Sequence, residues 1–297
     1  MLSAPRHRGG AVSAVLALLC AVGVAPALVP AADAPPTPSV RLSADGECRF
    51  PAQPLKGRPW SLQRVMLDQL WSKATGRGVT VAVIDSGVDS ANSQLTPALT
   101  DTGTDDFAPG THGKLDENGH GTMAAGIIAA REDPATGFVG LAREASIMPM
   151  RQNGGTDTQK GNVNTLAAAI TTAANTKDVK VINISQETSA PGGAAPGPLL
   201  EQAIRYAIDV RDVVVVAAAG NSGDKDNLDT YPAMYEGVLA VGASDRNNDR
   251  ATFSQNKPYV DVLAPGVDMW STVPRGGHCS GDGTSFAAPY ASAVAAL

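Results

Sequence analysis

The sequence has few of the residues that cofactor, metal and nucleic-acid sites require. Its 297 residues include three cysteines and four histidines, and aromatic residues make up 4% of the chain. The cysteines have no CxxC or other metal-ligand spacing, and no phosphate loop, GxSxG elbow or GxGxxG after a strand occurs. The formal net charge is −6, so the basic footprint that binds nucleic acid is missing. The sequence therefore predicts no cofactor, no metal and no nucleic-acid partner.

The sequence also has no apolar run at its start that spans a bilayer comfortably. The run over residues 11–24 is too short for that, follows Arg6 and Arg8, and precedes two small-residue cleavage sites. This pattern is typical of an export signal, which we assign to residues 1–34. We therefore expect an exported protein of the cell envelope or the extracellular space, without a transmembrane anchor in this chain.

The scarcity of cysteine limits the possible crosslinks. Cys20 lies inside the predicted signal and is expected to be removed with it, which leaves Cys48 and Cys279. In an oxidising compartment a single disulfide between these two is the default, and two free thiols are the alternative. The disulfide would tie the N-terminal part of the chain close to the segment that precedes Ser285.

Beyond the signal the chain has two parts. Residues 35–76 begin with a Pro-rich linker and continue as an extension, in which Leu62, Val65, Met66 and Leu70 recur at helical spacing and predict a helix over 61–73 capped by Ser61. Residues 77–297 alternate β-branched runs with Ala-rich helical patterns. Continuous apolar strands separated by helices predict an α/β fold with a mostly parallel sheet and helices on both faces.

Three short segments supply the groups of a nucleophilic hydrolase. They are VAVIDSGVDS with Asp85, NGHGTMAAGI with His120 and GDGTSFAAPY with Ser285. A serine hydroxyl needs a neutral histidine to take its proton, and the histidine needs a carboxylate to hold its tautomer. Asp85 ends a predicted strand, at the sheet edge where ligands bind in such folds, whereas His120 and Ser285 begin predicted helices.

A fourth segment, AAAGNSG, supplies Asn221 after another predicted strand. Its side-chain amide and the backbone N–H of Ser285 are candidate donors to an oxyanion. Taken singly, each of these residues also has an ordinary structural interpretation, as a strand-ending acid, a helix-start histidine or an N-cap serine. The four segments together argue against that interpretation, and His112 is the only rival base.

The order Asp, His, Ser and these four segments resemble the subtilases, over residues 79–297. The resemblance implies a serine endopeptidase with a subtilisin-like fold, a polypeptide substrate and a catalytic domain over residues 77–297. Cys48, Pro59-Trp60, Leu70-Trp71 and GRGVTVAVIDSGVD are similar to the mycosins, which are subtilases associated with type VII secretion systems of actinobacteria. This narrower resemblance implies limited processing and a type VII secretion membrane complex as a partner.

The resemblance also implies a substrate cleft between two segments, with the substrate pairing as an added strand. One side would be Ser185-Gln186-Glu187, and the other Ala218, Ala219 and Gly220. Many degradative subtilases have glycine where Glu187 stands. Its carboxylate either favours a basic or polar substrate residue before the scissile bond or simply faces solvent, and we prefer the second interpretation.

Two departures from the mycosins limit what the resemblance carries over. Glu117, Asn118 and Ser189 stand where mycosins commonly have cysteines, so their disulfide pattern does not transfer. Mycosins also continue past the nucleophile helix to a membrane-spanning helix, so we expect a domain that is C-terminally incomplete at Leu297. A degradative extracellular subtilase and a secretion-complex scaffold with little activity remain alternative functions.

Overall fold

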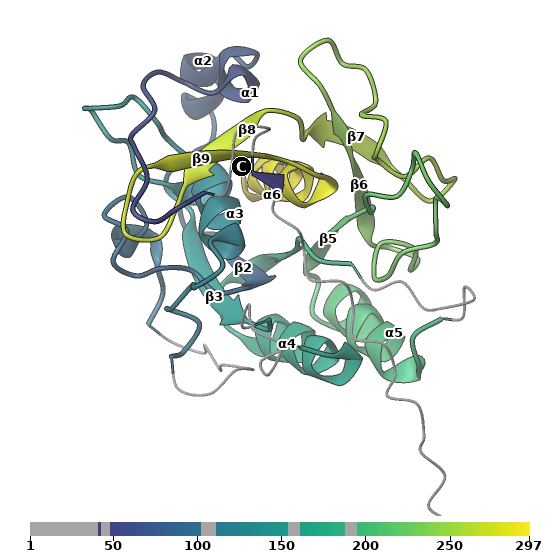
Figure 1. Cartoon of the computed structure of the whole chain (residues 1–297). Helices are drawn as coiled ribbons and strands as arrows, with labels where there is room; N and C mark the ends of the chain where they lie inside the picture. Colours follow the sequence, from purple (N-terminus) through teal and green to yellow (C-terminus); the bar gives the residue numbers. More distant parts are fainter. Residues whose placement is uncertain (1–40, 43–47, 102–110, 154–160, 188–194) are drawn as a thin grey trace, which may run out of the picture. The chain divides into compact units, whose positions relative to one another are not determined.

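The computed structural model describes residues 41–42, 48–101, 111–153, 161–187 and 195–297 (Figure 1). They belong to the larger of two units, Ala34–Leu297. The smaller unit, Met1–Asp33, lies outside the described residues, and with it the predicted export signal.

The main sheet has six parallel strands in the order β3-β2-β4-β5-β6-β7. Their bounds are β2 Thr80–Asp85, β3 Ser146–Arg151, β4 Val179–Ile184, β5 Val214–Ala218, β6 Leu239–Ser244 and β7 Val262–Pro265. A second, antiparallel sheet has the order β1-β9-β8, with β1 Arg41–Leu42, β8 Met269–Thr272 and β9 His278–Asp282. A short 3-10 turn, η1 Thr96–Ala98, follows β2.

Helices cover both faces of the main sheet because the strands alternate between two apolar faces. In β2, Val81 and Val83 join one core cluster, whereas Ala82 and Ile84 join the other. The first cluster contains α3 His120–Ala129 and α6 Thr284–Ala296, and the second contains α4 Val163–Asn175, α5 Pro198–Arg205 and its continuation η3 Tyr206–Val210. The predicted α/β fold with a mostly parallel sheet and helices on both faces is confirmed.

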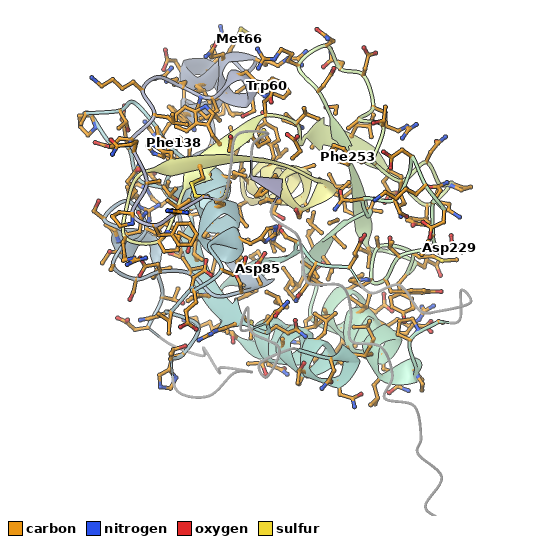
Figure 2. All side chains as sticks on the ribbon, viewed as in Figure 1. Trp60, Met66, Asp85, Phe138, Asp229 and Phe253 are labelled. Atoms are coloured by element: carbon orange, nitrogen blue, oxygen red, sulfur yellow. A yellow bond between two sulfur atoms is a disulfide. The ribbon has the colours of Figure 1, made fainter. Side chains whose placement is uncertain are left out.

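The extension forms two short helices, so the single helix predicted over 61–73 is wrong. The helix α1 covers Trp60–Gln63 and α2 covers Leu67–Trp71. The break exposes 69% of Met66, whose side chain points away from the ribbon in Figure 2, and it buries Leu67 instead. Ser61 is not a cap, because Pro59 is the residue at the N-cap and Ser61 lies inside the helix. The Ser61 carbonyl accepts a hydrogen bond from the Tyr290 hydroxyl at 3.2 Å.

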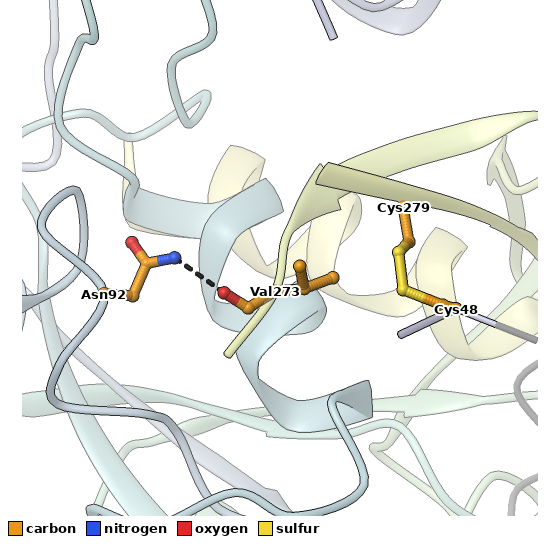
Figure 3. The surroundings of a disulfide bond; sticks show 4 residues. All are labelled: Cys48, Asn92, Val273 and Cys279. Carbon is orange, nitrogen blue, oxygen red and sulfur yellow. Dashed lines mark hydrogen bonds between the residues drawn. A yellow bond between two sulfur atoms is a disulfide. The ribbon is translucent and has the colours of Figure 1, made fainter. Parts of the chain in front are cut away.

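A disulfide joins Cys48 to Cys279 in β9, the pair predicted from the cysteine count, with their Cα atoms 6.1 Å apart (Figure 3). Backbone hydrogen bonds support it, since Ala52 N–H donates to Gly276 and His278 N–H donates to Gln53. On the other side of the hairpin, the Asn92 amide donates to the carbonyl of Val273, the residue directly after β8, at 2.9 Å (Figure 3). The extension is therefore crosslinked to the β8–β9 hairpin that leads into α6.

Candidate active site

Asp85 and His120 meet at the carboxyl edge of the main sheet. Asp85, labelled in Figure 2, is the last residue of β2, and His120 is the first residue of α3; each has only 1% of its side chain exposed. His120 Nδ1 lies 2.8 Å from Asp85 Oδ1 and 2.9 Å from Oδ2. Gly121 permits this approach, because a Cβ there would clash with the Gly87 carbonyl and lie 3.1 Å from the Asp85 Cβ.

The buried carboxylate of Asp116 fixes the start of α3, where His120 lies, and sequence analysis did not identify it. Its Oδ1 accepts from the Ser86 hydroxyl at 2.9 Å and from the Gly119 N–H at 2.8 Å, and its Oδ2 accepts from the Thr122 N–H and hydroxyl. Burial raises the pKa of Asp116, although the hydrogen bonds from Thr122 and Gly119 act in the opposite direction. The sequence signal that could have identified Asp116 is its position as an acidic residue shortly before the helix predicted to begin at His120.

The imidazole of His120 is arranged as a base. Burial alone would lower its pKa, but attraction and hydrogen bonding to Asp85, with a contribution from Asp116, raise the pKa of His120 overall. Within the described part of the chain its Nε2 is buried and has no hydrogen-bond partner. Because Nδ1 is bound to Asp85, Nε2 is the nitrogen left for a substrate-side proton.

Ser285 is the second residue of α6, directly before a residue that contacts this imidazole. The ring of the following residue, Phe286, is 5.2 Å from the His120 ring between centroids. No hydrogen bond links Ser285 Oγ to His120 Nε2 among the described residues, and such bonds are often long in unliganded enzymes. The Ser285 N–H, in the first turn of the helix, has no acceptor within the same part of the chain.

Asn221 is held beside Ser285 by Thr284, which sequence analysis also missed. Asn221 Oδ1 accepts from the Thr284 N–H at 2.9 Å and from its hydroxyl at 3.1 Å, while that hydroxyl accepts from the Gly220 N–H at 3.1 Å. A Cβ placed on Gly283 would lie 2.8 Å from Ser285 Oγ and 3.8 Å from Asn221 Oδ1, so both groups border the same glycine. Because the amide oxygen is occupied, the amide N–H groups of the exposed Asn221 are left for a ligand.

The residues predicted to line the cleft differ in what they offer. The Ser185 hydroxyl accepts from the Asn183 amide at 2.7 Å and is buried, and Gln186 donates to the Gln152 side chain at 2.6 Å. Gln186 makes no backbone hydrogen bond among the described residues, so this side retains groups that can pair with a substrate strand.

The opposite side of the predicted cleft has its backbone groups occupied. Ala218 and Ala219 are buried; the Ala219 N–H donates to Val241 and its carbonyl accepts from Thr230 at 2.6 Å. The Gly220 carbonyl accepts from the Gln255 N–H at 3.2 Å, and its N–H is bound to Thr284. The backbone groups of Ala219 and Gly220 are therefore not available to pair with a substrate strand, in contrast to those of Gln186.

The Glu187 side chain is only partly exposed and its Oε2 is buried, so the interpretation that its carboxylate simply faces solvent is wrong. Its side chain lies against Gly220, where a Cβ would clash with Oε2, and this oxygen is buried without a hydrogen-bond partner in the described chain. Burial raises the pKa of Glu187 to about 7, although the backbone N–H of Asn221 acts in the opposite direction. The positive φ of +108° at Gly220 also requires glycine there.

The other two histidines in the described part of the chain, His112 and His278, have different surroundings. His112 is exposed at a turn, and Asp85 pairs with His120. His278 is buried in a ring cluster with Phe138 and Trp270, and its Nδ1 accepts from the Leu55 N–H at 3.0 Å. Burial lowers the pKa of His278 to about 4, so it is neutral at physiological pH.

The described residues include no group of three or more His, Cys, Asp or Glu side chains positioned to hold a metal ion. None of their helices is long and apolar enough to cross a membrane.

Comparisons with known proteins agree on one family. Residues 76–297 match the model of the Subtilase family. M-protease from Shouchella clausii is 38% identical over 277 residues, which are 93% of this chain and 67% of that protein. Among solved structures, the MycP3 protease from the type VII (ESX-3) secretion system has a TM-score of 0.73 and 31% identity, covering 90% of this chain and 87% of its own. MycP1 from Mycobacterium smegmatis has a TM-score of 0.72 and 29% identity, covering 90% of this chain and 77% of its own.

Proposed function

Because the chain belongs to the subtilase family and is a serine endopeptidase, we propose that residues 77–297 are its catalytic domain and that Ser285, His120 and Asp85 carry out the reaction. Ser285 Oγ attacks the peptide carbonyl as His120 Nε2 accepts its proton, and the same nitrogen then protonates the leaving amine. Asp85 holds the tautomer of His120 through Nδ1 and stabilises the imidazolium. Water completes the cycle by hydrolysing the acyl-enzyme.

The oxyanion of the tetrahedral intermediate is bound by two donors, the Asn221 side-chain amide and the Ser285 N–H. The observation that carries the proposal is the buried Asp85–His120 pair, with separations of 2.8 and 2.9 Å, whose outer nitrogen has no partner in the described chain. A histidine held in this way is a general base that lacks only its proton donor.

Labelling followed by mass spectrometry tests the assignment. A phosphonylating serine-protease reagent should modify Ser285, and His120→Ala should abolish that modification. His112→Ala, the matched control for the rival base, should leave it unchanged. Asn221→Ala should lower kcat by about 10²–10³, a magnitude that belongs to subtilisin itself. An adduct on another residue of the folded enzyme, or loss of labelling in His112→Ala, would contradict the assignment.

We further propose that the enzyme is exported and performs limited processing associated with a type VII secretion system. Support comes from the likeness to MycP3 and MycP1 over 90% of the chain and from the disulfide, which suits an oxidising compartment. Cleavage of casein should then be confined to few sites, and the enzyme should co-purify with the membrane complex. Rapid digestion to small peptides would favour the degradative alternative, which the likeness to M-protease supports.

A further inference from the structure

We propose that Glu187 selects the substrate residue on the acyl side of the scissile bond, and that the residue it selects is cationic, lysine or arginine. The inference rests on the proposed function, because it concerns the substrate class of the same site. It is carried by the position of the Glu187 side chain and by the lack of a partner for its buried oxygen within the described chain.

The register of the sheet brings Glu187 to the proposed oxyanion site. In the parallel pair β4–β5, Ile184 is the partner of Ala217, and the same register continued past the strand ends sets Glu187 opposite Gly220. The steric contact between Glu187 Oε2 and Gly220 agrees with this register. Glu187 also lies near the backbone N–H of Asn221, whose side chain is fixed beside Ser285.

A substrate carbonyl held by Asn221 and the Ser285 N–H must belong to a residue whose own side chain is close by. The extended pairing available on the Ser185-Gln186-Glu187 side directs alternate side chains to the same face. The side chain of the acyl residue therefore meets the wall of Ala219 and Gly220 with the Glu187 carboxylate against it.

Apart from the Asn221 N–H, the described surroundings of Glu187 offer its carboxylate no partner. The Gln255 amide nitrogen is used by Ser222 Oγ at 2.8 Å and the Leu228 carbonyl at 3.0 Å, and the Thr230 hydroxyl is used by the Ala219 carbonyl. In the described chain no lysine or arginine pairs with Glu187. A buried carboxylate of this kind is costly unless a cation reaches it, and an ammonium or guanidinium of the substrate supplies that cation with charge-assisted hydrogen bonds.

Two measurements on the full chain test the proposal. The first compares kcat/KM for peptides that differ only in the acyl residue, which is arginine, lysine, norleucine or glutamate. The second measures the affinity of Ser285→Ala protein for acetylated peptides ending in arginine or norleucine, which requires no turnover. Both are repeated with Glu187→Gln, which keeps the size of the side chain, and with Asp224→Asn, which removes an exposed charge from the Asn221 loop.

The expected result is a preference of about 10- to 100-fold for arginine and lysine over norleucine, in the range of a hydrogen-bonded charge pair. Glu187→Gln should abolish this preference by lowering kcat/KM for the arginine and lysine peptides to that of the norleucine peptide, and Asp224→Asn should retain the preference. Equal use of all residues by the wild type, or a cationic preference that survives in Glu187→Gln, would overturn the proposal. Absence of turnover with a retained arginine preference in binding would instead refute the proposed function and leave the pocket assignment standing.

Discussion

Replacing Thr284 by valine isolates the hydroxyl that links Asn221, the proposed oxyanion donor, to Gly220. Valine keeps the shape of threonine and the backbone N–H that donates to Asn221 Oδ1 at 2.9 Å. It removes both hydroxyl bonds of 3.1 Å, one accepted from the Gly220 N–H and one donated to Asn221 Oδ1. The variant therefore changes how the Asn221 amide is held without changing any group proposed to touch the substrate.

The expected effects on stability and on catalysis have different origins. The buried Gly220 N–H loses its acceptor, which costs about 1–3 kcal/mol of unfolding free energy. Asn221 keeps one of its two bonds to Thr284, so the catalytic loss should be smaller than the ~10²–10³ caused by removing the asparagine of subtilisin, and we expect about 10-fold. It should appear in kcat more than in KM, because the oxyanion exists only in the transition state and intermediate.

Urea unfolding and steady-state kinetics on one peptide substrate measure both effects. Thr284→Ser is the matched control because it retains the hydroxyl, and it should stay close to the wild type in kcat. In an Asn221→Ala background, Thr284→Val should lower kcat little further, since the two residues act as one unit. A normal kcat in Thr284→Val would refute the positioning role, and an additive loss in the double variant would show that the hydroxyl acts elsewhere.

Three further predictions follow from burial and from the crosslink. The first concerns Glu187, whose pKa is raised from 4.5 to about 7. The folded state keeps a proton that the unfolded state loses between these pH values, so wild-type stability falls as pH rises through this window. Measured by urea unfolding, Glu187→Gln should be more stable than wild type by up to about 3 kcal/mol at pH 8 and by about none at pH 4. The second concerns the pH profile of kcat/KM. Its acid limb should have an apparent pKa above 6.5, because His120 must be neutral to act as a base and its pKa is raised. Asp85→Asn removes the attraction between the carboxylate and the imidazolium, so the acid limb of the residual activity should move to lower pH. The third concerns the disulfide, which closes a loop with a sequence separation of 231. Replacing Cys48 and Cys279 together by serine should lower the unfolding free energy by up to about 5 kcal/mol in the loop-entropy model. An unchanged urea midpoint would contradict this expectation.

Residues whose signal is local could be predicted, whereas those that depend on tertiary partners could not. The strands of the main sheet that are buried on both faces give continuous apolar runs, and Asp85 directly follows one of them. The β8–β9 hairpin has no such run, because HCSGD combines glycine and polar residues that are equally typical of a loop. The break between α1 and α2 depends on burying Leu67 instead of Met66, which the helical spacing alone does not distinguish.

The site divides in the same way. Residue type and chain order predict a nucleophile, a base, an orienting acid and an oxyanion donor, because the chemistry specifies these residue types. Thr284 and Asp116 act through hydrogen bonds to residues that are brought near them only by folding. The burial of Glu187 likewise requires the neighbouring segment at Gly220, which the sequence of its own segment does not reveal.

The crosslink between Cys48 and Cys279 also bears on how the enzyme survives its own activity. Asp85, His120 and Asn221 all lie between the two bridged positions in the chain, and Ser285 follows directly beyond them. A single cut anywhere in that stretch opens a covalent ring and releases no fragment, so both halves stay attached. A nicked molecule would keep its catalytic residues together, migrate as one band in non-reducing electrophoresis, and separate into two pieces only after a reductant is added.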